Sequence, residues 1–324
     1  MIRTLSPPQP VGTSASGLFC NPGQTVQSWY VAMPSRRLRR GKVVGVDMLG
    51  RRIAFWRDNA GDVHAVDAAC PHLGADLSLG DVIDGGLRCP FHHWRIGPDG
   101  ACVDAPCERR TPNRSTRSYP VAEMHGLIWV FNGPTPSFEI PTLPEDDDPK
   151  RYRRVRVPPL HLNCHPHLAL ANGLDVTHFD KLHGLTFTSE PTLEQVDGNR
   201  LRVTISGRPP SRWVQAITRT RRADVEAVFT TIGPSIAWLT FTRPLRFHAV
   251  FTARPDANGQ TDTQTFLYLP GFGFKALRCA ATLLCVLHAD RPVLNSIKFK
   301  PGFVESDKAL SLFARMINQM EPES

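Results

Sequence analysis

Four residues in the first third of the chain have the types and the spacing of metal ligands. Cys70 and His72 form one pair, and Cys89 and His92 form a second pair after sixteen intervening residues, 73 to 88. In each pair the cysteine comes first. A zinc site can use two cysteines and two histidines, but its usual spacings place Cys with Cys and His with His. Mixed pairs instead favour a binuclear centre in which each loop gives one ligand to each metal.

The residues around these pairs favour a Rieske [2Fe–2S] centre, in which one iron binds both cysteines and the other binds both histidines. Pro71 and Pro90 restrict the backbone directly after the cysteines. The stretch 70–94, CPHLGADLSLGDVIDGGLRCPFHHW, resembles the cluster loops of Rieske oxygenases. The spacing makes His92 the ligand in the second loop. His93 stands where that family usually has glycine.

A second group of candidate ligands lies about eighty residues further along the chain. His178 and His183 are five positions apart, and Asp175 precedes His178 by three. On an ideal helix, five positions leave two imidazoles about 140° apart. Convergence therefore needs a bend or a helix end, and Gly184 offers an end. Two imidazoles and a carboxylate with open positions form the facial triad of non-haem Fe(II) oxygenases. Alone this signal is weak, because such histidines are often ordinary core or surface residues.

The stretch also resembles the Asp-x-x-His-x-x-x-x-His motif of Rieske oxygenases. Asn172 stands three residues before the aspartate, as in the monooxygenase-like members. The resemblance implies that His178 and His183 bind a mononuclear iron. It also implies that Asp175 is an electron-transfer bridge, linking the cluster histidine His92 of one subunit to an iron histidine of the next. A carboxylate that accepts N–H bonds from two imidazoles would fix both tautomers.

The third iron ligand is expected to be a carboxylate far downstream, with Asp290, Glu305 and Asp307 as candidates. The segment from Ala289 to Gln319 resembles the C-terminal segment of 3-ketosteroid 9α-hydroxylases, in which the ligand aspartate opens a helix. This resemblance implies Asp290. A helix N-cap is the alternative role, and the two roles are compatible. Upstream, the stretch 161–167 (HLNCHPH) could bind metal by composition, but we interpret it as a strand-to-helix connection.

The elements that position these residues predict an α+β protein with two domains. Residues 1–26 are a tail and lead-in, and residues 27–135, with short apolar strands and turn residues, are predicted to form a small all-β Rieske domain. Residues 136–149 are rich in proline and acid, as in a linker. Residues 150–324 are predicted to form the catalytic domain, a helix-grip type antiparallel sheet with flanking helices.

Periodic patterns place the elements of this catalytic domain. Strands are expected near residues 200–206, 224–231, 236–242, 247–253 and 263–268, and helical spacing is found in 306–320. The apolar run 276–288 is predicted to be a buried helix, because it is shorter than the roughly 20 residues that span a bilayer. Residues 185–288, which are expected to shape the pocket, match nothing specific. Their many aromatic side chains suggest an apolar substrate, although most such residues belong to cores.

Composition limits the classes of partner and the compartment. The chain has 324 residues and a formal charge of +8, but its basic runs are scattered and lack interleaved aromatic residues, so we expect no nucleic-acid binding. Six further cysteines show no disulfide framework, which favours a reducing, cytoplasmic location. The first residues lack the apolar run of a secretory signal.

The resemblance implies the oxygenase component of a Rieske non-haem iron system, with a [2Fe–2S] cluster, a mononuclear Fe²⁺ and O₂ as co-substrate. Electrons would come from a ferredoxin and/or ferredoxin reductase, so NAD(P)H would act only indirectly. A homotrimer is implied, since the family's electron path crosses subunits. We expect hydroxylation (mono-oxygenation) of an apolar organic substrate, with a polycyclic one as candidate. The alternatives are demethylation, desaturation, or an electron-transfer protein without oxygenase chemistry.

Overall fold

The computed structural model of the chain describes residues 17–208, 224–243, 245–256, 258–271, 273–300 and 302–323. These residues form two compact units. One unit, here called the cluster unit, consists mainly of residues 27–140. The other, here called the sheet unit, consists mainly of residues 141–254 and 258–322.

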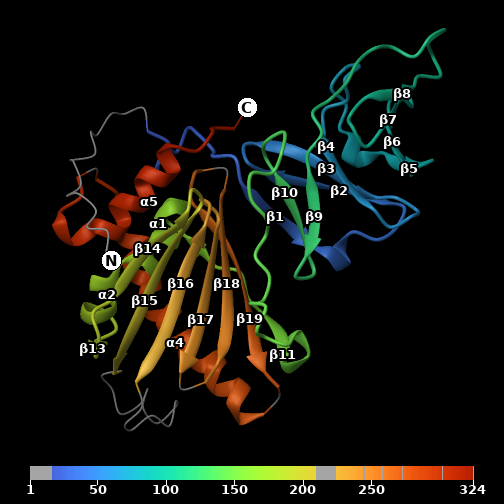
Figure 1. Cartoon of the computed structure of the whole chain (residues 1–324). Coiled ribbons are helices and arrows are strands. Elements are labelled where there is room, and N and C mark those ends of the chain that lie inside the picture. Colours follow the sequence, from blue (N-terminus) through green and yellow to red (C-terminus); the bar gives the residue numbers. More distant parts are fainter. Residues whose placement is uncertain are drawn as a thin grey trace. The chain divides into compact units, whose positions relative to one another are not determined.

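Three small antiparallel sheets build the cluster unit (Figure 1). The first has the order β1 (Trp29–Pro34), β10 (Leu127–Phe131) and β9 (Val121–Met124). The second runs β2 (Lys42–Met48), β3 (Arg51–Arg57) and β4 (Val63–Asp67). The third consists of β5 (Asp81–Ile83), β6 (Gly86–Arg88), β7 (Arg95–Ile96) and β8 (Cys102–Asp104). Single-turn 3₁₀ helices lie at η1 (Ser35–Arg37) and η2 (Leu77–Leu79).

Strand β3 separates two cores because successive side chains of a strand point to opposite faces. Ile53 and Phe55 pack into one core, which contains residues of β1, β2 and β10. Ala54 and Trp56 pack into the other, which contains Cys70, Cys89 and Trp94. The second core therefore holds the bases of both predicted ligand loops. The loop with Cys89 and His92 joins β6 to β7, and the loop with Cys70 and His72 precedes η2.

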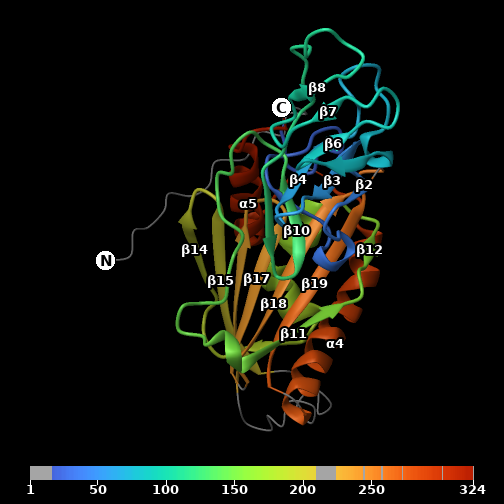
Figure 2. The same cartoon turned by 90° about the vertical axis from the view of Figure 1, so that its right-hand side faces the viewer.

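The sheet unit is built on a nine-stranded antiparallel sheet (Figures 1 and 2). Its main order is β11 (Tyr152–Val157), β19 (Thr261–Pro270), β18 (Phe247–Pro255), β17 (Ile236–Arg243), β16 (Val225–Ile232), β15 (Arg200–Arg208) and β13 (Thr186–Phe187). In addition, β12 (His161–Leu162) pairs with β19, and β14 (Thr192–Asp197) pairs with β15. The helices are α1 (Pro166–Ala171), α2 (Val176–Lys181), α4 (Phe274–Ser296) and α5 (Lys308–Asn318), with 3₁₀ turns η3 (Pro149–Arg151), η4 (Asn172–Leu174) and η5 (Glu305–Asp307).

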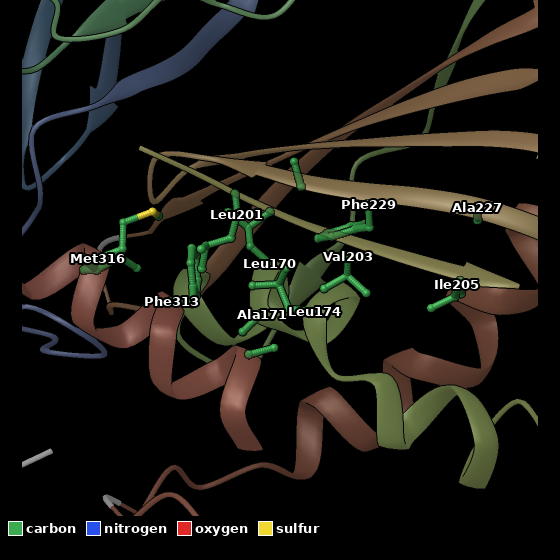
Figure 3. Packing of buried hydrophobic residues seen from close by; sticks show 14 of the residues in the cluster. Leu170, Ala171, Leu174, Leu201, Val203, Ile205, Ala227, Phe229, Phe313 and Met316 are labelled. Atoms are coloured by element: carbon green, nitrogen blue, oxygen red, sulfur yellow. The ribbon is translucent and has the colours of Figure 1, made fainter. Parts of the chain in front are cut away.

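The helices cover one face of this sheet, and the main core lies between the helices and that face. Along β15, Leu201, Val203 and Ile205 are buried while their neighbours are half-buried, the period-two pattern of a strand with one covered face. They pack with Leu174 of η4 and Phe313 of α5 (Figure 3). Each such apolar side chain contributes about 1.5–3 kcal/mol by leaving water. The core thus fixes the short segment η4–α2, which carries the candidate iron ligands.

Asp147 anchors the acidic stretch that leads into β11. The single Arg246 Nε–H is shared between both oxygens of the Asp147 carboxylate. The carboxylate also accepts a 2.6 Å bond from Arg246 Nη2 and a 2.7 Å bond from the Tyr152 hydroxyl. His248 Nε2 lies 3.2 Å from the same carboxylate. Burial alone would raise the pKa of Asp147, but these partners hold it below its usual value. Burial lowers the pKa of the fully buried His248 to about 4.

The predicted antiparallel sheet with flanking helices is confirmed, and the five predicted strands correspond to β15–β19. The helix predicted over 276–288 is present but longer, and its description as buried is wrong. α4 exposes Phe274, which is 83% exposed, together with Leu277 and Leu284. Apolar composition indicated burial, but only one side of this helix contacts the sheet. Among the described residues, no helix is both long and apolar enough to cross a membrane.

Candidate active site

The predicted cluster ligands lie in two loops of the cluster unit that fold by similar means. In the first, Cys70 N–H donates to the Ala75 carbonyl, and Gly74, at φ +79°, closes the turn. In the second, Cys89 N–H donates to the Trp94 carbonyl over 2.8 Å. There the left-handed position is occupied by His93, at φ +58°. Glycine adopts this conformation freely, whereas a histidine in it is strained.

The loops bring like ligands together. The thiols of Cys70 and Cys89 are in contact and buried, and the ring centroids of His72 and His92 are 4.7 Å apart. Burial and the neighbouring Cys89 thiol raise the pKa of Cys70 to about 11, so a metal must displace its proton on binding. Two adjacent thiols beside two adjacent imidazoles match the donor set of a Rieske cluster.

One buried atom supports this fit. Among the described residues, His72 Nδ1 is buried without any hydrogen-bond partner. A buried ring nitrogen that is left unpaired costs about 1–3 kcal/mol, and a metal ion would satisfy it. The residues present therefore fit a [2Fe–2S] cluster, with Cys70, His72, Cys89 and His92 as the predicted ligands.

In the sheet unit, the predicted iron ligands from α2 are held by a capped, very short helix. The Asp175 carboxylate accepts hydrogen bonds from the backbone N–H groups of Thr177 and His178, so it is the N-cap of α2. The Asp175 carbonyl accepts a 2.6 Å bond from His178 Nδ1–H. This bond fixes the tautomer and leaves Nε2 with a lone pair for a metal. Burial lowers the pKa of His178, which favours the neutral imidazole.

The helix end brings His183 back toward His178. α2 ends at Lys181, His183 N–H donates to the His178 carbonyl over 3.4 Å, and Gly184 follows at φ +62°. The two imidazole centroids are 5.0 Å apart. The ideal-helix angle would separate them, so the helix end is what makes them converge.

Asp290 completes the group from the distant helix α4. Its Oδ1 lies 2.9 Å from His183 Nε2 and 3.7 Å from His178 Nε2, and the residue is only 5% exposed. The expectation that this aspartate opens its helix is wrong, because α4 begins at Phe274 and Asp290 lies in its interior. Pro292 is also inside α4, where it has no backbone N–H to donate to the helix. The proline that suggested a helix start therefore lies in the interior of a helix.

The donor set of this group fits a mononuclear iron. Among the described residues, His183 Nε2 and Asp290 Oδ1 are buried and make no hydrogen bond of good geometry, although they face each other. Two imidazole nitrogens and one carboxylate oxygen are the ligands of a 2-His-1-carboxylate Fe(II) site. The other two carboxylates that were candidates for the third ligand, Glu305 and Asp307, lie in η5. Asp307 Oδ2 accepts a hydrogen bond from Val304 N–H.

A cavity of about 360 Å³ adjoins the candidate iron site. Its wall is mostly apolar and comes from α1, η4, α2, α4 and strands β15–β19. His178, His183 and Asp290 contribute to it, and so does Asn172, whose amide nitrogen lies 3.5 Å from His178 Nε2. The volume falls in the range of sites that enclose drug-sized ligands. The arrangement can hold an apolar molecule next to a bound metal.

The aromatic side chains of residues 185–288, which suggested an apolar substrate, are only partly found in this wall. Phe229, Phe241 and Phe251 line the cavity. Trp213 and Phe272 lie outside the described residues. The wall also contains residues that sequence reasoning missed, including Leu160, Thr265 and Cys285. Of these, only Thr265 lies in a strand, and alternation along a strand does not say which strands meet.

A second Cys/His group, Cys20, His165 and His167, also has its ligand atoms within 4.8 Å of one another. His167 Nδ1 accepts a bond from Cys20 N–H, and His165 Nδ1 accepts one from His167 N–H. Both rings must then carry their proton on Nε2, so a metal would break these bonds. Because His165 is the N-cap of α1 and follows β12, the strand-to-helix interpretation of this stretch is confirmed.

Two family models match the chain. Residues 28–120 match the Rieske [2Fe-2S] domain, and residues 129–265 match the 3-ketosteroid 9alpha-hydroxylase C-terminal domain. The chain is 28% identical over 319 residues to cholesterol 7-desaturase nvd of Bombyx mori, an alignment that covers 91% of this chain and 69% of that protein. It is 33% identical over 168 residues to the 3-ketosteroid-9-alpha-monooxygenase oxygenase component of Rhodococcus rhodochrous, covering 48% and 43%.

The chain spans less than half the length of several curated relatives that it matches. Among solved structures, dicamba monooxygenase bound to dicamba aligns with a TM-score of 0.67 at 21% identity, covering 91% of this chain and 97% of that one. Pseudomonas putida CBB5 NdmB aligns with a TM-score of 0.70 at 22% identity, covering 90% and 89%. At such identities the structural likeness concerns the fold alone.

Proposed function

The chain belongs to the Rieske oxygenases, and from this premise we propose that it is the oxygenase component of a Rieske non-haem iron system that hydroxylates an apolar, polycyclic substrate. The observation that carries the proposal is the apolar cavity that ends at His178, His183 and Asp290. When bound, the [2Fe–2S] cluster supplies one-electron transfer and the iron supplies O₂ activation. The protein's own residues exclude water and position the substrate.

The remaining parts of the proposal rest on the resemblance and on composition. We propose a homotrimer that receives electrons from a ferredoxin and/or a ferredoxin reductase, with NAD(P)H used only by that partner. A cytoplasmic location is supported by eight free thiols. We also propose that residues 27–135 form the Rieske domain and residues 150–324 the catalytic domain.

Asp175 is proposed to bridge the cluster histidine His92 of one subunit and His178 of the next. Its carboxylate also caps α2, so replacing it with alanine would disturb the helix that carries His178 as well as the bridge. Asp175→Asn is the sharper variant, since an amide oxygen can still cap the helix. We expect this variant to keep both metals and lose turnover. Asp180→Asn, on the exposed side of the same helix, is the matched control. Normal turnover of Asp175→Asn would refute the bridge.

The first experiment is the metal content of the purified protein. Iron and acid-labile sulfide per chain, with electron paramagnetic resonance after dithionite reduction, should give three irons, two sulfides and a Rieske-type spectrum. The same spectrum with two irons, and none gained on adding Fe(II), would favour an electron carrier. Zinc without sulfide would overturn the proposal.

Desaturation is the second candidate function, because the alignment with the cholesterol 7-desaturase spans 91% of the chain. Both reactions use the same site, so the products must separate them. Sterols and ketosteroids should be incubated with the protein and a reducing partner, and the products analysed by mass. A gain of one oxygen indicates hydroxylation, and a loss of two hydrogens indicates desaturation. A smaller fragment together with an aldehyde would indicate demethylation.

A further inference from the structure

Trp94 touches both ligand loops of the cluster unit. Its indole lies parallel to the His72 imidazole, with ring centroids 4.4 Å apart and an interplanar angle of 4°. Its main-chain carbonyl accepts the hydrogen bond from Cys89 N–H. Trp94 is 2% exposed and belongs to the same core as Cys70 and Cys89. One side chain therefore fixes the orientation of a predicted ligand in the first loop while its backbone closes the second loop.

The indole nitrogen of Trp94 differs from that of every other described tryptophan. Among the described residues, Trp94 Nε1 is buried without a hydrogen-bond partner. The other four donate to a protein oxygen at 2.8–3.1 Å: Trp29 to Phe138, Trp56 to Gly85, Trp129 to Met124 and Trp238 to Thr240. The indole nitrogen can only donate, and burying an unpaired donor costs about 1–3 kcal/mol. An acceptor outside the polypeptide is therefore expected here.

We propose that Trp94 is a positioning residue of the cluster, whose indole N–H donates a hydrogen bond to a sulfur atom of the bound [2Fe–2S] group and raises its reduction potential. This inference rests on the proposed cluster site. Hydrogen bonds to the sulfurs of an iron–sulfur cluster are one of the factors that set its potential, because they stabilise the added electron. The parallel stack on His72 gives the indole a fixed orientation, so the bond would be present in both oxidation states.

Trp94→Phe tests the proposal, because phenylalanine keeps an aromatic ring against His72 and removes the N–H donor. Trp129→Phe is the matched control, since Trp129 is equally buried in the cluster unit but donates to the Met124 carbonyl. Both full-length proteins would be measured for iron and sulfide per chain, for the resonance spectrum of the reduced cluster, and for midpoint potential. We expect Trp94→Phe to keep the cluster with a lower potential, and Trp129→Phe to match the wild type. An unchanged potential in Trp94→Phe would overturn the proposal and leave water as the acceptor.

A measurement on the wild-type chain covers the case in which Trp94→Phe loses its cluster. Protein with ¹⁵N-indole-labelled tryptophan would be reduced and studied by pulsed electron paramagnetic resonance. A coupling to one indole nitrogen and to one exchangeable proton is expected, and it should persist in Trp129→Phe. Absence of any indole coupling would refute the bond. A wild-type protein without sulfide would instead refute the proposed function, so the two failures are distinguishable.

Discussion

Replacing Asp290 with asparagine should remove the stabilisation that Fe(II) gives to the protein. A ligand that binds only the folded state stabilises it by about 2.7 kcal/mol when its concentration is a hundred times its Kd. In a domain of 150–250 residues, about 1 kcal/mol shifts the melting temperature by about 2–4 °C. Anaerobic Fe(II) at that concentration should therefore raise the wild-type melting temperature by about 5–10 °C.

The loss in Asp290→Asn follows from the geometry of the three ligands. Asp290 supplies the only carboxylate oxygen within 3.7 Å of His178 Nε2 and 2.9 Å of His183 Nε2 among the described residues. Loss of a residue that only hydrogen-bonds a metal ligand lowers metal affinity about 10–100-fold. Loss of the ligand itself should therefore lower Fe(II) affinity about a hundredfold or more. At the same Fe(II) concentration the stabilisation then falls to about 0.4 kcal/mol or less, about 1 °C.

Asp307→Asn is the control, because Asp307 was also a candidate carboxylate and its role is a bond to Val304 N–H. It should change stability little with or without metal, because an amide oxygen can still accept that bond, and it should keep the full Fe(II)-dependent shift. Calorimetric melting with and without Fe(II) gives both quantities. A full shift in Asp290→Asn, or its loss in Asp307→Asn, would refute the ligand assignment.

Three further changes test other parts of the structure. His248→Gln should reduce the loss of stability between about pH 6.5 and 4, because wild-type His248 stays neutral in the fold down to a pKa of about 4 while the unfolded chain binds a proton. Gly173→Ala should cost about 1–3 kcal/mol, since its new methyl group would lie 2.2 Å from the Phe229 ring, and Phe229→Leu should restore part of this loss. His93→Gly should be about 1 kcal/mol more stable than His93→Ala, because only glycine relieves a backbone at φ +58°.

Denaturant unfolding checks all three. The explanation from the neutral, buried His248 fails if the stability difference between His248→Gln and wild type is the same at pH 5 and pH 7.5. Additive effects of Gly173→Ala and Phe229→Leu would mean that the two residues do not contact each other. Equal stabilities of His93→Gly and His93→Ala would show that the left-handed conformation is not strained.

Local spacing carried the predictions of both ligand groups, because their members are close in sequence. His72 and His92 each lie within three residues of a cysteine, and His178 and His183 lie on either side of one helix end. Strand positions were predictable for a related reason. Burial alternates along β15 in the structure as apolar residues alternate in its sequence.

The predictions that failed, or could not be made, depended on contacts between distant segments. Asp290 was proposed from a resemblance, and its position inside α4 rather than at its start was not predicted, because Pro292 is usually a sign of a helix start. The cavity wall combines residues of five strands with one side of α4. Likewise, the sequence does not show that the Trp94 indole N–H lacks an acceptor, because this depends on which atoms surround it in the folded chain.

The polypeptide between His183 and Asp290 contains strands β13–β19, so an ion bound by both residues closes a loop of about a hundred residues. It then acts as a reversible cross-link across the sheet. For a covalent link of this span, the loss of chain entropy in the unfolded state amounts to about 4.7 kcal/mol, which sets the scale for a metal link. α4 forms one wall of the cavity and also carries one end of the link. Release of the ion and loosening of that wall are therefore coupled, and the cavity keeps its shape best while the metal is bound.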